Sequence, residues 1–382
     1  MEDSYTFSSP QYDTAVLFLT NRCNLRCTYC YASSGEYTVY NMDIETAKAA
    51  VDRVLLDVMA NKWEEMTLGF HGGGEPTLNW KVLTEIVEYA SEITSENGIH
   101  LNLSGSFNGY WSPAVRKFML DRFTDISLSF DGIETVQNAQ RPTTGKNGSY
   151  QEVLDTIIAL DDSPVSYGIR MTVTEENLGF LEESVSFIAE NFHPKKIQVE
   201  PVFLEGRAKK YNLRINNIQN FVSQFIKAYR AAEERGIDLF YSGAQLDVLT
   251  TRFCLAACRA LVVTPEGNVT TCFEIFGHTH PLSDSFIVGQ LTQDGFQIDQ
   301  TKLNAVFGRT VNHIDHCRDC FCKWHCAGDC AAKTDFSAEN ISYPTDRCLI
   351  NQELIKFFIL DRIHKNEGLI WSDGYKIKEG TL

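Results

Sequence analysis

Cysteine is the residue type whose placement in this chain most directly predicts chemistry. Of the 12 cysteines in 382 residues, three lie at positions 23, 27 and 30, and the other nine lie between residues 254 and 348. Cysteines that only fill a core would be scattered along the chain, whereas metal-ligating cysteines are grouped at short spacings. The distribution therefore predicts that thiolates bind metal in two separate parts of the chain.

The first group, Cys23, Cys27 and Cys30, has the spacing C-x3-C-x2-C and directly follows the first expected strand. Cysteine thiolates are the ligands of iron–sulfur clusters. Three thiolates on one loop can bind three irons of a four-iron, four-sulfur (4Fe-4S) cluster and leave the fourth iron open. A structural zinc site takes four protein ligands, and no fourth Cys or His is near in the sequence. The spacing therefore favours such a cluster over zinc or inert cysteines.

This stretch resembles the signature of the radical S-adenosylmethionine (SAM) superfamily. Members of that superfamily bind SAM through its amino and carboxylate groups on the open iron. One electron then splits SAM into methionine and a 5′-deoxyadenosyl radical, which takes a hydrogen atom from the substrate. The resemblance implies that Cys23, Cys27 and Cys30 ligate this cluster and that Tyr29 packs near SAM and offers backbone contacts to adenine. It also implies an electron donor of the flavodoxin or ferredoxin type.

A glycine-rich segment after the second expected strand extends the resemblance. Residues 71–76 read HGGGEP, which is similar to the superfamily segment that binds the SAM amino group. Glycines without a Cβ allow the backbone to approach a ligand closely. The resemblance implies this role for Gly73, Gly74 and Glu75.

A second segment resembles the part of the superfamily that holds the SAM carboxylate. Residues 129–132 read SFDG and are followed by Arg141 and a proline. The resemblance implies that Ser129 and Arg141 hold the carboxylate. Arg170, on the polar face of the fifth expected strand, is the alternative to Arg141.

The second group of cysteines resembles the SPASM extension, which holds two auxiliary 4Fe-4S clusters. Its elements, G-x4-C from Gly267 and C-x2-C-x5-C-x3-C from Cys317, are present residue for residue. The resemblance implies two sets of four ligands: the first auxiliary set, Cys254, Cys258, Cys272 and Cys330, and the second auxiliary set, Cys317, Cys320, Cys326 and Cys348. Cys322 is left over as a spare thiol. From spacing alone, two zinc sites in a ribbon-like module are the alternative.

The first 245 or so residues alternate short β-rich runs with amphipathic helical stretches. One helix is expected from the N-cap Asp43, and another is expected to contain Ile218 and Tyr229 and to end at Gly236. Six βα units in series predict a parallel sheet, and we expect an α/β fold with a partial (β/α)6 barrel; an open doubly wound sheet is the alternative. The strands are expected at residues 15–20, 66–71, 99–104, 125–130, 166–173 and 196–202.

Five of these strands alternate apolar and polar residues. In the fourth, Ile126, Leu128 and Phe130 alternate with Ser127 and Ser129, so that each kind lies on its own face. Parallel strands that are buried on both faces usually read as continuous apolar runs. The alternation therefore predicts a polar barrel interior that binds a polar ligand or is hydrated.

The character of the chain changes after about residue 245. Cysteines and glycine-containing turns replace the βα rhythm, and a helix from Leu349 to about Lys365 follows. We expect a barrel domain at 1–245, a small cysteine-rich α+β auxiliary-cluster domain at 246–350, and a C-terminal helix and tail at 351–382.

The composition excludes several classes of function. The net charge of −16 argues against binding of nucleic acid, and no run of about 18 apolar residues predicts a membrane span. The N-terminus has no basic start or apolar core of a signal peptide. We therefore expect a cytoplasmic protein, where thiols stay reduced.

The resemblance implies an enzyme that modifies a peptide or protein, because most SPASM proteins do so. We expect side-chain oxidation or crosslinking, for example thioether formation. A sulfatase maturase that makes formylglycine is the alternative, but it carries an Asp directly after the Cys of the G-x4-C element, where this chain has Phe273. Only 22 residues precede Cys23, which is too few for a leader-binding domain, so a separate leader-binding protein or none is expected.

A non-catalytic electron-transfer protein is the alternative from another class, although electron transfer alone requires neither the glycine-rich segment nor a polar barrel face. For an enzyme, the proton lost after hydrogen abstraction needs an acceptor. The candidates are Glu274, Glu200 and His71. Glu274 is favoured because it follows Cys272 by two residues. Glu200 can instead bind the SAM ribose or adenine, and His71 can instead position the glycine-rich segment.

Overall fold

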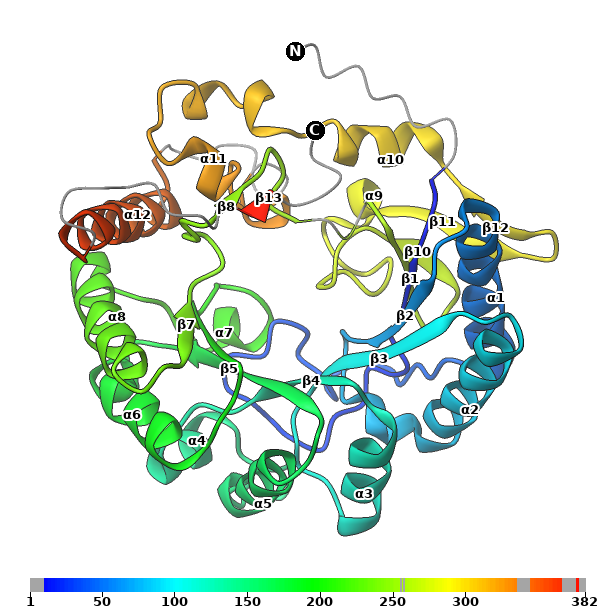
Figure 1. Cartoon of the computed structure of the whole chain (residues 1–382), viewed down its shortest axis with the longest axis horizontal. Coiled ribbons are helices and arrows are strands. Elements are labelled where there is room, and N and C mark those ends of the chain that lie inside the picture. Colours follow the sequence, from blue (N-terminus) through cyan, green and yellow to red (C-terminus); the bar gives the residue numbers. More distant parts are fainter. Residues whose placement is uncertain (1–9, 255, 257, 335–343, 366–375, 378–382) are drawn as a thin grey trace.

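The computed structural model describes residues 10–254, 256, 258–334, 344–365 and 376–377. Its main feature is a curved sheet of eleven strands in the order β12-β11-β10-β9-β1-β2-β3-β4-β5-β6-β7. The sheet does not close on itself, and helices cover its outer side (Figure 1). The expected partial barrel is confirmed, and the open doubly wound sheet is wrong because the helices are not divided between two faces.

All six expected strands are present, and each pairs in parallel with the next. Their ends differ from the expected ones by a few residues. The bounds are β1 Thr14–Leu17, β2 Glu65–Phe70, β3 His100–Phe107, β4 Asp125–Ser129, β5 Ser166–Val173 and β6 Lys196–Pro201.

The sequence did not reveal two further parallel strands. β7 (Asp238–Phe240) adds to β6, and β9 (Ala260–Val263) pairs with β1. Antiparallel β10 (Asn268–Thr270), β11 (Ile287–Thr292) and β12 (Gly295–Ile298) continue from β9. The cysteine-rich part therefore shares its sheet with the barrel, and the division at about residue 245 stays a prediction.

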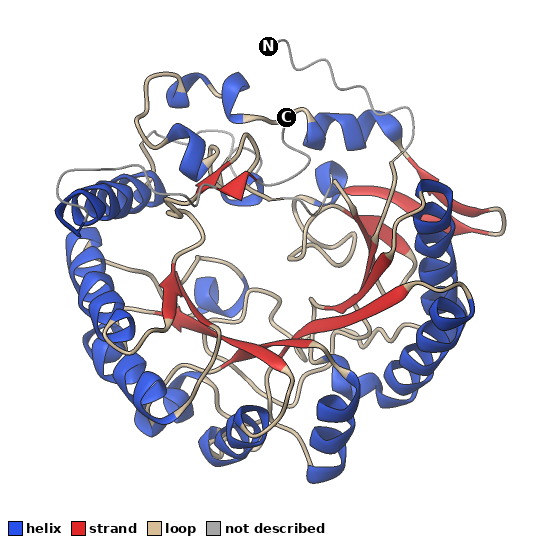
Figure 2. Ribbon diagram, viewed as in Figure 1, coloured by secondary structure: helices blue, strands red, loops and turns tan. Residues whose placement is uncertain are grey.

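The helices form the outer layer of the barrel (Figure 2). The larger ones are α1 Ile44–Asn61, α2 Trp80–Glu96, α3 Pro113–Arg122, α4 Glu134–Gln140, α5 Tyr150–Asp161, α6 Leu181–Asn191, α8 Ile218–Glu233, α10 Gln300–Phe307 and α12 Asp346–Lys365. Shorter elements are α7 Gly206–Lys210, α9 Ser283–Phe286, α11 Lys323–Cys326, β8 Val248–Leu249 and β13 Lys376–Ile377. None of the helices in the described ranges is long and apolar enough to cross a bilayer.

Local signals explain where the expected helices begin and end. The Asp43 side chain accepts a hydrogen bond from Thr46 N at 2.7 Å and caps α1. α8 ends at Glu233, and Gly236 turns the chain with a φ of +73°. α12 begins three residues before the expected Leu349, so Arg347 and Cys348 lie in its first turn.

The two faces of the barrel strands differ as the alternation predicts. Ile126 and Leu128 of β4 are fully buried in the core between sheet and helices, whereas Ser127 and Ser129 on the other face are only partly buried. Arg170 and Thr172 repeat this pattern in β5. The polar faces point inward, so the sheet delivers polar groups to the barrel interior.

The turn after β4 depends on a glycine, and this yields a stability prediction. Gly132 has a φ of +107°, and a Cβ there would lie 2.1 Å from the Cβ of Ser184 in α6. Gly132→Ala should therefore add overpacking of about 1–3 kcal/mol to the backbone strain of about 1–2 kcal/mol. Gly98→Ala is the matched control, because Gly98 also has a positive φ but no atom within 4 Å of the added Cβ. The urea midpoint of unfolding of Gly132→Ala, followed by circular dichroism, should be well below that of Gly98→Ala. Equal midpoints would contradict the close packing at this turn.

Candidate active site

One cavity of about 180 Å³ lies at the carboxyl ends of the barrel strands. This is the edge at which barrel enzymes build their sites. Every residue expected to bind SAM or the first cluster lines it, as do the three candidate bases. These residues are Cys23, Cys27, Tyr29, Cys30, His71, Gly73, Gly74, Glu75, Ser129, Arg141, Arg170, Glu200 and Glu274. The structure therefore brings together all of these residues, while their individual roles stay predictions.

The loop from Cys23 to Cys30, here called the first cysteine loop, is attached to the segment after α4. Arg26 N donates to Pro142 O at 2.7 Å, and Thr28 N donates to Gln140 O at 2.8 Å. These backbone hydrogen bonds connect the loop to the stretch that carries Arg141. The position of the cysteines relative to the expected carboxylate site is thus fixed.

Arg207 holds the other side of the first cysteine loop, and sequence analysis missed it. Its side chain is buried, and its Nη1 donates to Cys27 O at 2.6 Å and its Nη2 to Ser34 O at 2.5 Å. Its Nε donates to Glu36 at 2.6 Å, and its backbone N–H donates to Cys30 O at 2.9 Å. No motif marks this arginine; the only signal is its place just after the sixth expected strand.

Glu75 is buried, and its carboxylate already accepts several hydrogen bonds. One oxygen accepts from Asn108 N at 2.8 Å, and the other accepts from the Thr77 hydroxyl at 2.8 Å and from Trp111 Nε1 at 3.4 Å. Burial raises the pKa of Glu75, and these donors oppose the shift. A Cβ on the neighbouring Gly74 would lie 2.1 Å from Arg22 O. The glycine-rich segment therefore packs tightly against the residue just before the first cysteine loop. The hydrogen bonds of Glu75 fix the conformation of this segment.

Tyr29, Asp131 and Arg141 form a buried network beside the first cysteine loop. The Tyr29 hydroxyl donates to Asp131 at 2.7 Å, and Arg141 Nη1 donates to the Tyr29 oxygen at 2.6 Å. The other Asp131 oxygen accepts from Thr172 N at 3.0 Å. Arg141 Nε is buried and has no protein partner. A buried donor without an acceptor is costly, so this arginine fits the expected role of binding a carboxylate in the cavity.

His71 lies between the barrel and the cysteine-rich part. Its ring is 4.9 Å from the ring of Phe273, and its Nδ1 is buried without a partner. Burial lowers the pKa of His71 to about 4, and the nearby Arg170 cation adds to this effect while Glu274 opposes it. His71 is therefore neutral near pH 7 and is a weak proton acceptor.

Glu274 shares the buried Lys333 ammonium with Glu205. Lys333 Nζ lies 2.6 Å from Glu274 and also pairs with Glu205, the residue two positions before Arg207. Burial opposes ionisation of Glu274, but Lys333 and then Arg170 outweigh it and hold its pKa below the usual range. Glu274 thus lines the cavity and is held there by its ion pair with Lys333.

Glu200 is also buried but is fixed by neutral donors. Gln198 Nε2 donates to its carboxylate at 2.8 Å, and Ser242 N donates to the same oxygen at 3.0 Å. Ser242 follows the added strand β7, so the short strand that sequence analysis missed also orients this side chain. The second carboxylate oxygen accepts neither of these hydrogen bonds, and the residue lines the cavity.

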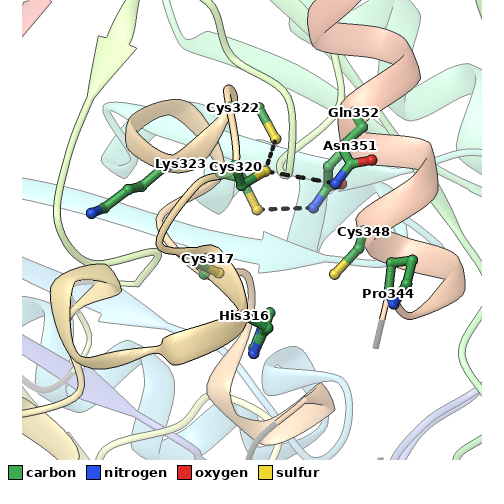
Figure 3. Close-up of a pocket in the computed structure, with 11 residues that line it drawn as sticks. His316, Cys317, Cys320, Cys322, Lys323, Pro344, Cys348, Asn351 and Gln352 are labelled. Carbon is green, nitrogen blue, oxygen red and sulfur yellow. Dashed lines mark hydrogen bonds between the residues drawn. The ribbon is translucent and has the colours of Figure 1, made fainter. Parts of the chain in front are cut away.

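Two further cavities are each lined by four of the expected auxiliary ligands. The smaller, of about 70 Å³, is lined by Cys254, Cys258, Cys272 and Cys330, the whole first auxiliary set. The larger, of about 270 Å³, is lined by Cys317, Cys320, Cys326 and Cys348, the whole second auxiliary set. Figure 3 shows Cys317 and Cys320 on one segment and Cys348 on α12, around this space.

These cavities are suited to a group larger than one metal ion. Four sulfurs on a zinc ion would lie about 2.3 Å from it and would leave no space between them, whereas a cluster places several atoms between its ligands. Within the described part of the chain, no three His, Cys, Asp or Glu side chains are gathered closely enough to bind a single ion. Four thiolates around a space of this kind fit an iron–sulfur cluster.

Comparison with known proteins agrees with this geometry. Residues 17–188 match the Radical SAM superfamily. The chain is 20% identical over 348 residues, 86% of its length, to the radical SAM cyclopropyl synthase TigE of Paramaledivibacter caminithermalis, of which it covers 69%. It is 20% identical over 337 residues, 81% of its length, to the cysteine-type anaerobic sulfatase-maturating enzyme of Clostridium novyi, of which it covers 85%.

A solved structure supports the fold over nearly the whole chain. Native anSMEcpe with bound AdoMet, which is SAM, matches with a TM-score of 0.72 and 18% identity, covering 93% of this chain and 100% of that one. The likeness spans the barrel and the cysteine-rich part that extends its sheet. With the cavity, the first cysteine loop and the superfamily match in agreement, residues 17–188 form a Radical SAM domain, and the chain is a radical SAM enzyme.

Proposed function

We propose that this enzyme is a peptide or protein maturase that uses SAM to oxidise or crosslink a side chain, for example by forming a thioether. The observation that carries the proposal is the single cavity that joins the first cysteine loop, the expected SAM residues and the carboxylates Glu200 and Glu274. A non-catalytic electron-transfer protein needs no such cavity. The sequence relatives include a cyclopropyl synthase and a sulfatase-maturating enzyme, and a solved structure of this fold contains both AdoMet and the Cp18Cys peptide.

The chain's own residues account for binding of SAM. Arg141 lines the cavity and has a buried Nε without a protein partner, so its guanidinium would pair with the SAM carboxylate. Ser129 lies on the same lining. Arg170 lines the cavity too but is only partly buried, so we assign it to the substrate side. The glycine-rich segment offers backbone carbonyls to the amino group, and Glu75 keeps that segment in place.

A cluster held by Cys23, Cys27 and Cys30 would supply the electron that splits SAM into methionine and the 5′-deoxyadenosyl radical. The two auxiliary sets would hold two further clusters. Each of these sets has four cysteines, one for each iron of a 4Fe-4S cluster, which leaves no iron open for SAM. We therefore assign cleavage to the first cysteine loop alone.

A flavodoxin- or ferredoxin-type protein is the proposed electron donor, and the surface near Arg207 is suited to an acidic partner. Lys209, Lys210 and Arg214 are exposed there, and no acidic residue occurs from 206 to 232 in a chain of net charge −16. Because Arg207 contacts the first cysteine loop directly, a partner on this surface would lie close to the cluster that needs its electron. Opposite charges on the two surfaces would speed their association.

Sulfatase maturation is the second candidate function. It is favoured by the similarity to the sulfatase-maturating enzyme, because the match covers 85% of that relative's length. The residue that opposes it is Phe273, which stands where that class of enzyme has its Asp and packs on His71. Glu274, one position further, is the cavity carboxylate instead. Assays with a sulfatase-derived peptide and with a thioether-forming peptide would separate the two functions by the product formed.

The cysteine sets yield a prediction about metal content. Three clusters correspond to about 12 iron and 12 sulfide per chain after anaerobic reconstitution. Changing Cys23, Cys27 and Cys30 together to Ala should remove about a third of the iron and abolish formation of 5′-deoxyadenosine. Changing Cys322 to Ala is the control, because this cysteine belongs to none of the sets and should leave the iron content unchanged. Iron and zinc measured by plasma mass spectrometry test this, and stoichiometric zinc without iron would refute it.

Arg207 yields a prediction about the first cysteine loop. Arg207→Lys keeps the charge but cannot make the three side-chain hydrogen bonds, which leaves buried carbonyl groups without donors. Unpaired buried groups cost about 1–3 kcal/mol each, so we expect SAM cleavage to fall by about tenfold or more. Arg214→Lys, on the same exposed surface, should cleave SAM at the parent rate. If both variants behave like the parent, Arg207 does not position the loop.

The expected proton acceptor leads to a prediction about product formation. We assign the role to Glu274, because Lys333 keeps this carboxylate ionised and fixes its position at the cavity edge. Glu274→Gln should still form 5′-deoxyadenosine at near the parent rate while the modified peptide falls by about 100-fold, within the usual range for loss of a general base. Glu200→Gln is the comparison variant. Full product formation by Glu274→Gln, with loss in Glu200→Gln, would transfer the role to Glu200.

A further inference from the structure

Hydrogen-bond donors surround the sulfurs of the second auxiliary set. Two of them are neighbouring amides on α12: Asn351 Nδ2 lies 3.1 Å from Cys326 Sγ, and Gln352 Nε2 lies 3.6 Å from Cys320 Sγ. Figure 3 shows both amides directed into the cysteine cavity from the same helix. Cys348, in the first turn of this helix, is itself an expected ligand. One helix therefore supplies both a ligand and two donors to its neighbouring ligands.

The orientation of the Asn351 amide is fixed by a buried ion pair. Its Nδ2 also donates to Asp329 Oδ2 at 3.2 Å, and a carboxylate paired with arginine only accepts hydrogen bonds. Asp329 in turn accepts from Arg347 Nε at 2.5 Å and from Arg347 Nη2 at 2.6 Å. Asn351 is fully buried. The amide nitrogen, rather than its oxygen, is therefore the atom that faces Cys326.

Two other side chains add donors to the same set. The Thr345 hydroxyl donates to Cys348 Sγ at 3.3 Å. The spare Cys322 lies with its Sγ 3.3 Å from Cys320 Sγ, so its thiol can donate to a Cys320 thiolate. Three of the four ligands in this set thus have a side-chain donor close to sulfur.

The surroundings of the first auxiliary set carry charges of both signs. Glu274 and Asp329 act on cysteines of this set, but the cations Lys333 and Arg347 act there too, and they pair with these carboxylates. Asp329 also acts on Cys326 of the second set. The side-chain donors to sulfur, rather than a difference in charge, are therefore the feature of the second set that bears on its potential.

We propose that Asn351 and Gln352 raise the reduction potential of the second auxiliary cluster. The inference rests on the proposed function, since it requires the second auxiliary set to hold a cluster. Reduction adds one negative charge to a cluster, and a donor to a ligand sulfur stabilises the reduced form more than the oxidised form. Asn351 and Gln352 act through the ligand sulfurs, as positioning residues rather than catalytic ones.

The test is a potentiometric titration of the auxiliary clusters followed by electron paramagnetic resonance. It is done in the background that lacks Cys23, Cys27 and Cys30, so that only auxiliary signals remain. Cys254→Ala with Cys258→Ala, and Cys317→Ala with Cys320→Ala, assign each signal to its set. Gln352→Leu and Gln352→Met remove the donor at a half-buried position, where either side chain can be accommodated. Gln300→Leu is the matched control, because the Gln300 amide bonds to Asn304 and to no sulfur.

In Gln352→Leu and Gln352→Met, the reduced-to-oxidised ratio of the second cluster at a fixed potential should fall about tenfold, a shift of about 59 mV for one electron. The first auxiliary cluster should keep its potential in these variants, and Gln300→Leu should leave both potentials unchanged. An unchanged potential of the second cluster in iron-complete Gln352 variants would overturn the inference. Loss of iron from the second set in both Gln352 variants would overturn it as well, since Gln352 would then serve assembly. Failure of the proposed function is distinct: the parent itself would lack auxiliary iron.

Discussion

The buried guanidinium of Arg207 is the interaction on which the geometry of the candidate site depends. It binds two carbonyls of the segment that begins at the first cysteine loop, and it pairs with Glu36 of the same segment. Two positions earlier, Glu205 pairs with Lys333 of the cysteine-rich part, and Lys333 also holds Glu274. A single short stretch after β6 therefore fixes the loop that is expected to cleave SAM and the carboxylate that is expected to take the proton.

Several ion pairs near the site are largely buried, although the stability of the fold alone would not favour burying charge. Removing charges from water is expensive, and a buried pair often stabilises a fold less than well-packed apolar residues would. The Glu205–Lys333–Glu274 group and the Asp329–Arg347 pair both lie next to expected cluster ligands. We interpret them as pairs that hold functional side chains in one orientation, because few other conformations would keep both charges paired in an apolar surrounding. The unpaired Nε of Arg141 fits the same explanation, because a ligand carboxylate would satisfy it.

Local patterns in the sequence predicted most of the site. The cysteine spacings, the HGGGEP segment and the alternation of Ser127 and Ser129 with apolar neighbours depend on residues close together in the chain, so a single sequence reveals them. All of the residues singled out in this way for the SAM site line one cavity. The six βα units likewise have strong periodicity, and their strands lie where it indicates.

What could not be predicted depends on contacts between distant segments. Arg207 meets Cys27 across 180 positions, and no spacing rule connects them. The pairing of β9 with β1 joins residues about 245 positions apart, so no local pattern indicated that the cysteine-rich part extends the sheet of the barrel. β7 has three residues, too few for an alternation to be recognised. The environment of Glu274 could not be predicted either, because its partner Lys333 lies far from it in the sequence.

The most direct test of this account is an anaerobic crystal structure of the reconstituted protein with SAM, with data collected on both sides of the iron absorption edge. The account predicts iron at the first cysteine loop and within both auxiliary sets, and SAM in the central cavity with its carboxylate on Arg141. Zinc in place of iron in the auxiliary sets, or SAM bound away from Arg141 and the first cysteine loop, would contradict it.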